Sequence, residues 1–195
     1  MSVARPKRDA NTAERILDAA EALVQTRGFN GFSYAHVAAE LGITKASLHY
    51  HFAGKAELGE ALIVRYAARF GDALAEIDGG QADAREKLRA YVELYAEVLR
   101  ENRMCLCGIL AAEYQTLPAP MRDATIGFFE ANQAWLTKVL ILGRGEGTLR
   151  FDGDPGDIAQ TVVASLEGAM LLARPYGDAS RFDAAAGRLL AGLSQ

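Results

Sequence analysis

Apolar residues recur along most of this chain at spacings of three and four, which is the period of an amphipathic helix. No stretch alternates apolar and polar residues for long enough to predict a strand. Glycines and prolines fall between the helical segments, where they end one helix and allow the next to begin. The predicted helices span residues 12–27, 33–41, 44–51, 55–77, 83–101, 105–116, 121–142, 157–173 and 178–193. The sequence therefore predicts an all-α fold.

The second and third predicted helices have the pattern of a helix-turn-helix. Ser33 is a good N-cap, and Val37 and Leu41 fall on one apolar face of the helix that follows it. Gly42 stands where the chain must turn. A pair of short helices in this order can be a DNA-reading motif or an ordinary antiparallel helix pair whose exposed polar residues have no partner.

The third predicted helix begins after Thr44, which can cap it. Leu48 and Phe52 lie four residues apart and face the core. The remaining face is polar and carries Lys45, Ser47, His49 and Tyr50. A short helix with a polar, hydrogen-bonding outer face can enter the major groove of DNA.

The longer context favours the DNA-reading interpretation. Over roughly a quarter of the chain, from Thr12 onward, the sequence resembles the amino-terminal domain of TetR/AcrR-family transcriptional regulators. This stretch reads TAERILDAAEALVQTRGFNGFSYAHVAAELGITKASLHYHFAGKAEL. The matching positions are Ile16, Leu17, Ala19, Ala20, Gly28, Phe29, Ser33, Val37, Ala38, Gly42, Ile43, Lys45, Leu48, His51, Phe52, Lys55 and Leu58.

This resemblance implies a three-helix DNA-binding domain at residues 1–54 and a helical effector-binding and dimerisation domain at residues 55–195. It further implies that the fourth helix, which begins at Lys55, links the two domains mechanically. The family commonly has a tyrosine after the leucine of the reading helix, where this chain has His49 followed by Tyr50, so either ring can meet the phosphate backbone. The expected contacts to operator DNA are Ser33, Tyr34, Thr44, Lys45, Ser47, His49, Tyr50 and Lys55, with Lys45 and Tyr50 leading.

Charge modifies this picture only slightly. The 195 residues carry a net charge of −4, which argues against a nucleic-acid partner. Residues 1–55, however, hold seven Lys and Arg against five Asp and Glu, so this part is positive by two and the remainder is negative by six. Arg5, Lys7 and Arg8 predict an unstructured basic arm, which either neutralises phosphates or is a solvated tail.

Half of the residues are apolar, enough to build a core, and no apolar run has the form of a signal peptide or the length of a membrane span. We therefore expect a cytoplasmic protein with no membrane partner.

The last two predicted helices carry apolar stripes that are rich in small residues, which permits close helix packing. The stripes suit either an intramolecular core or a subunit interface. In TetR-like proteins the corresponding pair packs against its copy as a four-helix interface, and a two-fold dimer would read paired DNA half-sites. The resemblance therefore implies a homodimer whose interface includes Val162, Leu166, Met170, Phe182, Leu189 and Leu190.

Aromatic and sulfur-containing side chains gather in the central helices. Aromatics at helical spacing can be plain core or can line an apolar cavity, and the resemblance favours a cavity for a small-molecule effector. The candidates are Tyr91, Tyr95, Met104, Cys105, Cys107, Tyr114, Phe128 and Trp135.

The two cysteines are candidates for redox chemistry. Two residues apart on a helix they differ in direction by about 200°, so a disulfide between them is geometrically poor. Cys105 lies near a predicted helix start and near Arg103, and both features favour the reactive thiolate. The segment CLCGILAAE also resembles a helix-six motif of a TetR branch in which some members sense electrophiles or oxidants through a cysteine. Two inert, buried thiols are the alternative.

No other pattern predicts catalysis or a cofactor. The three histidines, His36, His49 and His51, all fall in the predicted DNA-binding part, which argues against a metal site with the cysteines. The sequence thus predicts a ligand-responsive regulator that is not an enzyme, most simply a repressor released from a palindromic operator by its effector. Alternatives are a thiol-based sensor acting through Cys105 or Cys107, a small thiol-dependent enzyme, and an interaction protein that has lost DNA binding.

Overall fold

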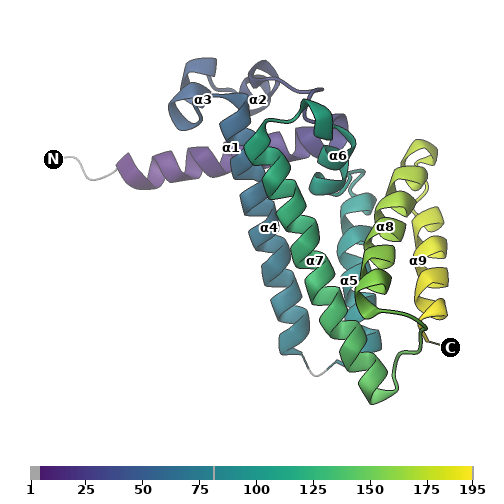
Figure 1. Cartoon of the computed structure of the whole chain (residues 1–195). Coiled ribbons are helices and arrows are strands. Elements are labelled where there is room, and N and C mark those ends of the chain that lie inside the picture. Colours follow the sequence, from purple (N-terminus) through teal and green to yellow (C-terminus); the bar gives the residue numbers. More distant parts are fainter. Residues whose placement is uncertain (1–4, 81, 195) are drawn as a thin grey trace. The chain divides into compact units, whose positions relative to one another are not determined.

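The computed structural model describes residues 5–80 and 82–194, and side chains from residue 11 onward. Within this part every regular element is helical, which confirms the all-α prediction (Figure 1). The α-helices are α1 (Arg5–Arg27), α2 (Tyr34–Leu41), α3 (Lys45–His51), α4 (Lys55–Gly79), α5 (Ala84–Arg100), α6 (Leu106–Ala112), α7 (Ala119–Glu146), α8 (Pro155–Ala173) and α9 (Ser180–Gly192). Two short 3-10 helices, η1 (Tyr114–Thr116) and η2 (Arg174–Tyr176), follow α6 and α8.

The helix boundaries differ most from the predicted ones in α1, α6 and α7, and the predicted helix 105–116 is divided at Glu113 into α6 and η1. Residues 5–11, expected in an unstructured basic arm, belong to the backbone of α1, and Pro6 is tolerated because it lies in the first helical turn. Helix α7 continues to Glu146 through Gly143, where a break was expected. A Cβ atom on Gly143 would lie 2.5 Å from the Leu149 side chain, so the glycine is needed for close packing rather than for a turn.

The chain packs as two compact units. Unit 1 comprises residues up to Tyr66 together with Leu106–Thr125, and unit 2 comprises Ala67–Cys105 and the residues from Ile126 onward. This division by packing differs from the predicted functional division at residue 54, because unit 1 also includes the start of α4 and the segment 106–125. Helices α4 and α7 each contribute to both units.

Local signals place the short helices of unit 1. Ser33 caps α2 in a capping box with His36, whose Nδ1 accepts the Ser33 backbone N–H at 3.3 Å. Gly42 ends α2 in the left-handed region at φ 64°, a conformation that glycine adopts without strain. Thr44 then caps α3 by accepting the Ser47 backbone N–H at 3.2 Å.

In unit 2, helices α8 and α9 lie side by side and both contact α5 (Figure 1). Asp83 begins α5 with a capping box in which its side chain accepts the Glu86 backbone N–H at 2.8 Å. Leu88 on α5, Leu166 on α8 and Phe182 on α9 are almost completely buried. Burial of these apolar faces is the main favourable contribution to packing.

An arginine on α4 joins the helices of unit 1. The Arg65 guanidinium lies 2.8 Å from both Asp18 and Glu21 and 3.0 Å from Glu14, all on α1. The Arg65 and Glu21 side chains are 15% and 8% exposed, whereas Glu14 and Asp18 are largely solvated. The pair Arg65–Glu21 is therefore the buried part of this ion-pair network.

We expect Arg65→Met to lower the free energy of unfolding by about 3 kcal/mol, because it leaves the Glu21 carboxylate buried without its cation. Glu14→Gln removes an exposed member of the same network and should cost less than about 1 kcal/mol. Urea titration followed by circular dichroism measures both. Equal losses from the two variants would contradict a buried Arg65–Glu21 pair.

Candidate functional site

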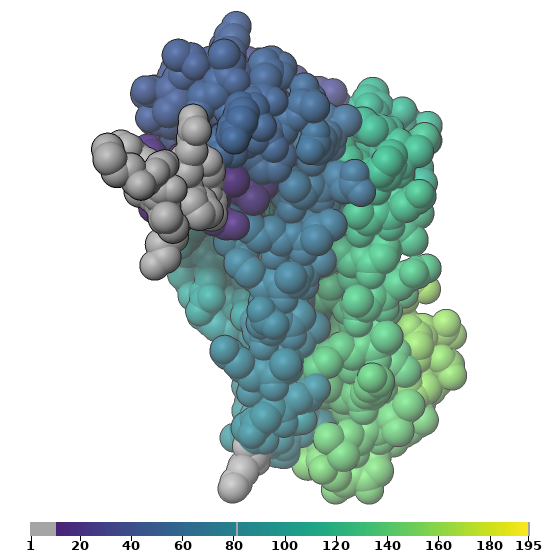
Figure 2. Space-filling model, turned by 90° about the vertical axis from the view of Figure 1, so that its left-hand side faces the viewer, coloured from purple at the N-terminus to yellow at the C-terminus, as the bar shows by residue number. Residues whose placement is uncertain are grey.

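Helix α3 presents a polar surface that is open to solvent. Leu48 is buried beneath the helix and holds it to unit 1, while Lys45 and Tyr50 face outward. In the space-filling view α2 and α3, coloured blue, form an outer surface (Figure 2). The arrangement leaves one side of α3 for packing and the other free for a partner.

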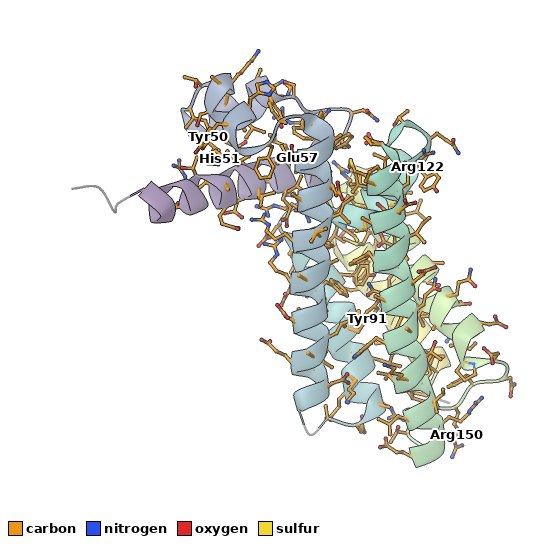
Figure 3. The ribbon with its side chains drawn as sticks, turned by 60° about the vertical axis from the view of Figure 1, so that its left-hand side comes forward. Tyr50, His51, Glu57, Tyr91, Arg122 and Arg150 are labelled. Carbon is orange, nitrogen blue, oxygen red and sulfur yellow. The ribbon has the colours of Figure 1, made fainter. Side chains whose placement is uncertain are left out.

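The structure distinguishes the two rings of the reading helix. Tyr50 is 74% exposed. Its ring makes an edge-to-face contact with His51, whose ring centroid lies 5.1 Å away (Figure 3). His49 is held more firmly, since its Nδ1 atom lies 3.1 Å from the Ala53 carbonyl and its ring lies 4.8 Å from that of Tyr34. Tyr50 is therefore the more accessible of the two rings.

Tyr34 at the start of α2 has a structural role. Its hydroxyl donates to the Phe52 carbonyl at 3.0 Å, which links α2 to the end of α3. Burial and, to a smaller extent, the nearby Glu57 carboxylate raise the pKa of Tyr34 to about 12. The Tyr34 hydroxyl therefore stays protonated at physiological pH, and the Tyr34 ring packs against that of His49.

The side chain of Lys55, at the first position of α4, packs against aromatic rings instead of extending into solvent. Its ammonium lies 4.6 Å from the centroid of the Phe29 ring and 4.5 Å from that of Phe32. Burial lowers the pKa of Lys55, and the Glu113 carboxylate opposes that effect. This lysine is engaged in cation–π contacts inside unit 1.

Five of the eight predicted DNA contacts line one surface pocket of about 380 Å³. The pocket is lined by Phe32, Ser33, Tyr34, Ala35, Lys45, His49 and Lys55. Hydroxyl donors and ammonium groups on one concave surface can hold a phosphate. Thr44, Ser47 and Tyr50, the other three predicted contacts, lie outside this lining.

The predicted effector residues divide between the two units. Tyr91, Tyr95, Phe128 and Trp135 are packed together in unit 2, and Phe70 of α4 joins them by edge-on contacts with three of these rings. Met104 and Cys105 are buried in the same unit, whereas Cys107 and Tyr114 belong to unit 1. Tyr114 is half-buried there and faces the Arg122 guanidinium at 5.7 Å.

Polar groups run through this aromatic cluster. The Tyr91 hydroxyl donates to the Asn132 side-chain oxygen at 3.0 Å and lies 3.1 Å from the Tyr95 hydroxyl. The Trp135 indole N–H donates to Asp78 at 2.9 Å. Burial raises the pKa of both tyrosines above the ordinary value. The two buried hydroxyls at the centre of the cluster therefore stay neutral, and the Asp78 carboxylate accepts from the Trp135 indole.

Glu167 of α8 adds an acid to this cluster. Burial raises the pKa of Glu167 to about 7, against a smaller opposite effect of a hydrogen bond with the Cys105 side chain. Its Oε1 atom is buried and has no hydrogen-bond partner among the described residues. Near neutral pH this carboxyl therefore exchanges readily between its protonated and ionised forms.

Cys105 and Cys107 are both buried and form no disulfide, as their spacing predicted. The Cys105 side chain is hydrogen-bonded with the Glu167 carboxyl. Arg103, expected to favour the thiolate, lies 3.4 Å from Glu101.

The residues predicted for the subunit interface differ in their exposure. Val162, Leu166, Met170 and Phe182 are almost completely buried within the protomer. Leu189 and Leu190 remain at least partly accessible. The strongly exposed apolar side chains of this region are Leu171, Leu172 and Tyr176, which sequence periodicity did not identify.

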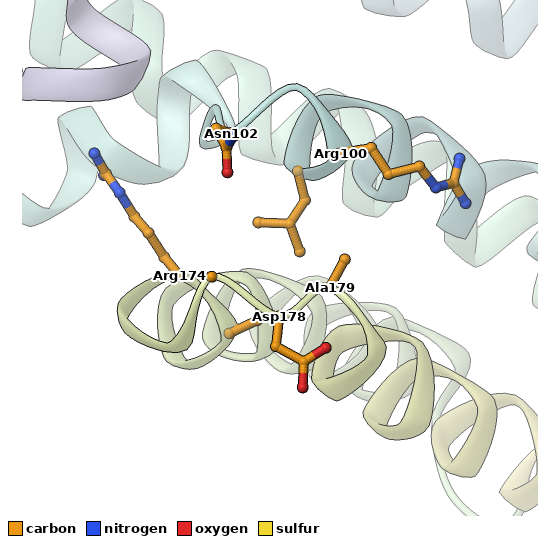
Figure 4. A pocket seen from close by; sticks show the side chains of 8 residues that line it. Arg100, Asn102, Arg174, Asp178 and Ala179 are labelled. Atoms are coloured by element: carbon orange, nitrogen blue, oxygen red, sulfur yellow. The ribbon is translucent and has the colours of Figure 1, made fainter.

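A further pocket of about 320 Å³ in unit 2 lies between the end of α5 and the connection from α8 to α9 (Figure 4). Two of its charged groups have partners: Arg100 pairs with Glu93, and Asp178 accepts the Ser180 backbone N–H at 3.0 Å. We assign no ligand to this pocket.

Comparison with known proteins identifies the family. The model of bacterial regulatory proteins of the tetR family matches residues 16–62, and that of the tetracyclin repressor-like C-terminal domain matches residues 84–189. The chain belongs to the TetR family. It is a transcriptional regulator of that family by its matched domains and by its relatives.

Named relatives of this TetR-family regulator include transcriptional repressors. The repressor NemR of Escherichia coli is 29% identical over 168 residues, covering 84% of each chain. The transcriptional regulator AcuR of Cereibacter sphaeroides is 30% identical over 153 residues, covering 76% of this chain and 69% of AcuR.

Solved structures agree with this assignment. A TetR-family regulator from Agrobacterium tumefaciens is 32% identical with a TM-score of 0.92, and the match covers 96% of this chain and all of that one. The reduced form of E. coli NemR is 27% identical with a TM-score of 0.81, covering 92% and 95% of the two chains.

Two acidic residues of this TetR-family regulator escaped the sequence analysis. Glu167 is the one charged residue between Ile158 and Ala173, which was a usable signal for a buried polar group. Glu113 ends the segment CLCGILAAE, and only its position in space shows its contacts with residues far away in the chain. The described helices include none that could span a membrane, and the described residues hold no cluster of metal-ligating side chains.

Glu167 makes the stability of this TetR-family regulator depend on pH. Its pKa is raised from the ordinary 4.5 to about 7 in the folded chain, so folding is penalised increasingly as pH rises through this range. We expect Glu167→Gln to resemble the native protein below pH 4.5 and to be more stable above pH 7, by at most about 3 kcal/mol.

Chemical unfolding between pH 4 and pH 8 tests this expectation. Glu130→Gln, at an exposed position of α7, is the matched control and should show no such divergence. A Glu167→Gln difference that is the same at every pH would show that the native carboxyl does not titrate in this window.

Proposed function

We propose that this chain is a repressor that binds a near-palindromic operator in double-stranded DNA as a homodimer and is released by a small-molecule effector. The observation that carries the proposal is the exposed polar face of α3, capped by Thr44 and anchored by buried Leu48. The names of relatives support it, since NemR and DhaR of Mycobacterium sp. are both transcriptional repressors.

In this proposal residues 1–54 form the DNA-binding part. Lys45 and Tyr50 make the leading contacts, because they are the charged and aromatic side chains that extend outward from α3. Ser33, His49 and Lys55 line the neighbouring pocket and support phosphate binding. The remaining candidates, Tyr34, Thr44 and Ser47, act mainly by fixing α2 and α3.

Residues 55–195 form the effector-binding and dimerisation part. The aromatic and polar cluster around Tyr91, Trp135 and Glu167 is the candidate effector site, since it combines flat apolar surfaces with a few hydrogen-bonding groups. Coupling of about 1–3 kcal/mol between effector and operator changes DNA affinity roughly 5- to 150-fold. Helix α4 is one continuous element that contributes to both units and can transmit the change.

Dimerisation in this proposal uses the exposed apolar side chains at the end of α8 and in η2. Leu172 and Tyr176 line a concave patch with Ala169, Arg181 and Ala185. Solvated leucines beside small residues are typical of a surface that packs against a partner. A second copy supplies a complementary face because a two-fold dimer uses the same patch twice.

We infer regulation rather than thiol catalysis because both cysteines are buried, which restricts the access of a substrate to either thiol. The same burial weighs against Cys105 as an electrophile sensor. The operator is chromosomal in this proposal, so we place the protein in the cytoplasm.

We expect Lys45→Ala to weaken operator binding and to reduce the slope of log affinity against log salt by about two, because each of the two subunits loses one phosphate contact. Lys138→Ala is the matched control, since it removes the same charge from an exposed position of α7 in unit 2. Fluorescence anisotropy over a salt series gives both quantities. An unchanged slope for Lys45→Ala would exclude its phosphate contact.

We expect Leu172→Glu to raise the dimer dissociation constant at least about tenfold, because a buried leucine contributes about 1.5–3 kcal/mol and a carboxylate would be desolvated. Sedimentation equilibrium measures the constant. Ile141→Glu, at an exposed apolar position of α7, should leave it unchanged. A native-like dimer in Leu172→Glu would place the interface elsewhere.

A further inference from the structure

Glu113, the residue between α6 and η1, reaches a turn that lies more than eighty residues earlier in the chain. Its Oε2 atom accepts the Phe29 backbone N–H at 2.7 Å and the Asn30 backbone N–H at 3.2 Å. Both bonds pair an ionised oxygen with backbone donors just beyond the end of α1, and such bonds are stronger than neutral ones. The carboxylate therefore fixes the turn from α1 to α2.

The turn is shaped to receive this carboxylate. Gly28 has φ 81°, which favours glycine, and a Cβ atom there would collide with Glu113 Oε1. The backbone conformation at this position therefore favours glycine, and the Glu113 carboxylate lies directly against it.

A positive charge completes the surroundings of the carboxylate. The Lys55 ammonium lies over the rings of Phe29 and Phe32, and the Glu113 charge acts favourably on it. One acid therefore interacts with the end of α1, the α1–α2 turn and the first residue of α4. These are the elements between which α2 and α3 are held.

The neighbours of Glu113 in the segment 106–125 make further contacts with the same region. The Thr116 hydroxyl accepts the Asn30 side-chain N–H at 2.7 Å and donates to the Glu113 carbonyl at 2.9 Å. Met121 lies so close to Gly59 of α4 that a Cβ atom there would be 2.5 Å from its sulfur. Thr116 and Met121, which follow Glu113 in the chain, therefore help to keep it in place through contacts with the α1–α2 turn and with α4.

We propose that Glu113 is a positioning residue for DNA recognition, which holds the α1–α2 turn so that α2 and α3 present the reading face in one orientation. Helix α2 begins directly after this turn, with Ser33 as its cap, and α3 packs on α2, so displacement of the turn displaces both helices. The inference rests on the proposed DNA-binding function. It adds a residue that touches neither the groove nor the effector cluster.

The test uses the full-length protein and an operator duplex that the native protein selects from genomic fragments. We expect Glu113→Ala to lower operator affinity about tenfold, because the loss of both backbone hydrogen bonds lets the turn, and with it α2 and α3, leave the orientation that fits the operator. Affinity for a scrambled duplex should not change, because nonspecific binding depends on phosphate contacts that the variant retains. Amide exchange in residues 28–33 should become faster. Glu113→Gln keeps an acceptor oxygen and should lose less affinity.

Asp123→Asn is the matched control, since it removes one negative charge from an exposed position of the same segment and should behave as native. Equal loss of operator and scrambled-duplex affinity would indicate general destabilisation and overturn the inference. So would native operator affinity in Glu113→Ala. If the alanine variant does not fold, the same comparison of operator and scrambled-duplex affinity is made with Glu113→Gln, and the same outcomes support or overturn the inference. Failure of the native protein to select any duplex would instead refute the proposed function itself.

Discussion

A helix of seven residues does not keep its shape in water by itself, so the reading surface on α3 depends on being held from behind. Leu48 supplies the burial, Thr44 supplies the cap, and Tyr34 ties α2 to the residue that ends α3. Only one side of α3 is used for this purpose. The opposite side can therefore be polar and exposed, which is what recognition of a groove requires.

The interior of unit 2 is governed by a different constraint, because its aromatic rings carry polar groups that must find partners away from water. Tyr91 and Asn132 satisfy each other, and Trp135 reaches the carboxylate of Asp78. Glu167 differs from them, because its Oε1 atom has no hydrogen-bond partner among the described residues and burial raises its pKa to about 7. In the proposed effector site this oxygen is an acceptor for a ligand that carries a hydrogen-bond donor.

The parts of the fold and of the candidate site that could be predicted from sequence are those that depend on local signals. Caps and apolar periodicity located α2 and α3, and the outward position of Lys45 and Tyr50 followed from the burial of Leu48. Periodicity alone left open whether the stripes on α8 and α9 pack on their own chain or on another, because a stripe does not tell the two apart, and the subunit interface was inferred from the family resemblance. Arg65, Glu113 and Glu167 act through residues distant in sequence, and no local pattern identifies such partners.

The central claim is that two copies of this chain bind one duplex through paired reading helices. Selection of genomic fragments by the purified protein, followed by sedimentation of the complex with the enriched duplex, tests it most directly. The account predicts a near-palindromic sequence whose half-sites lie about one helical turn or a multiple of it apart, bound by an even number of chains. A monomer that enriches no sequence would contradict it.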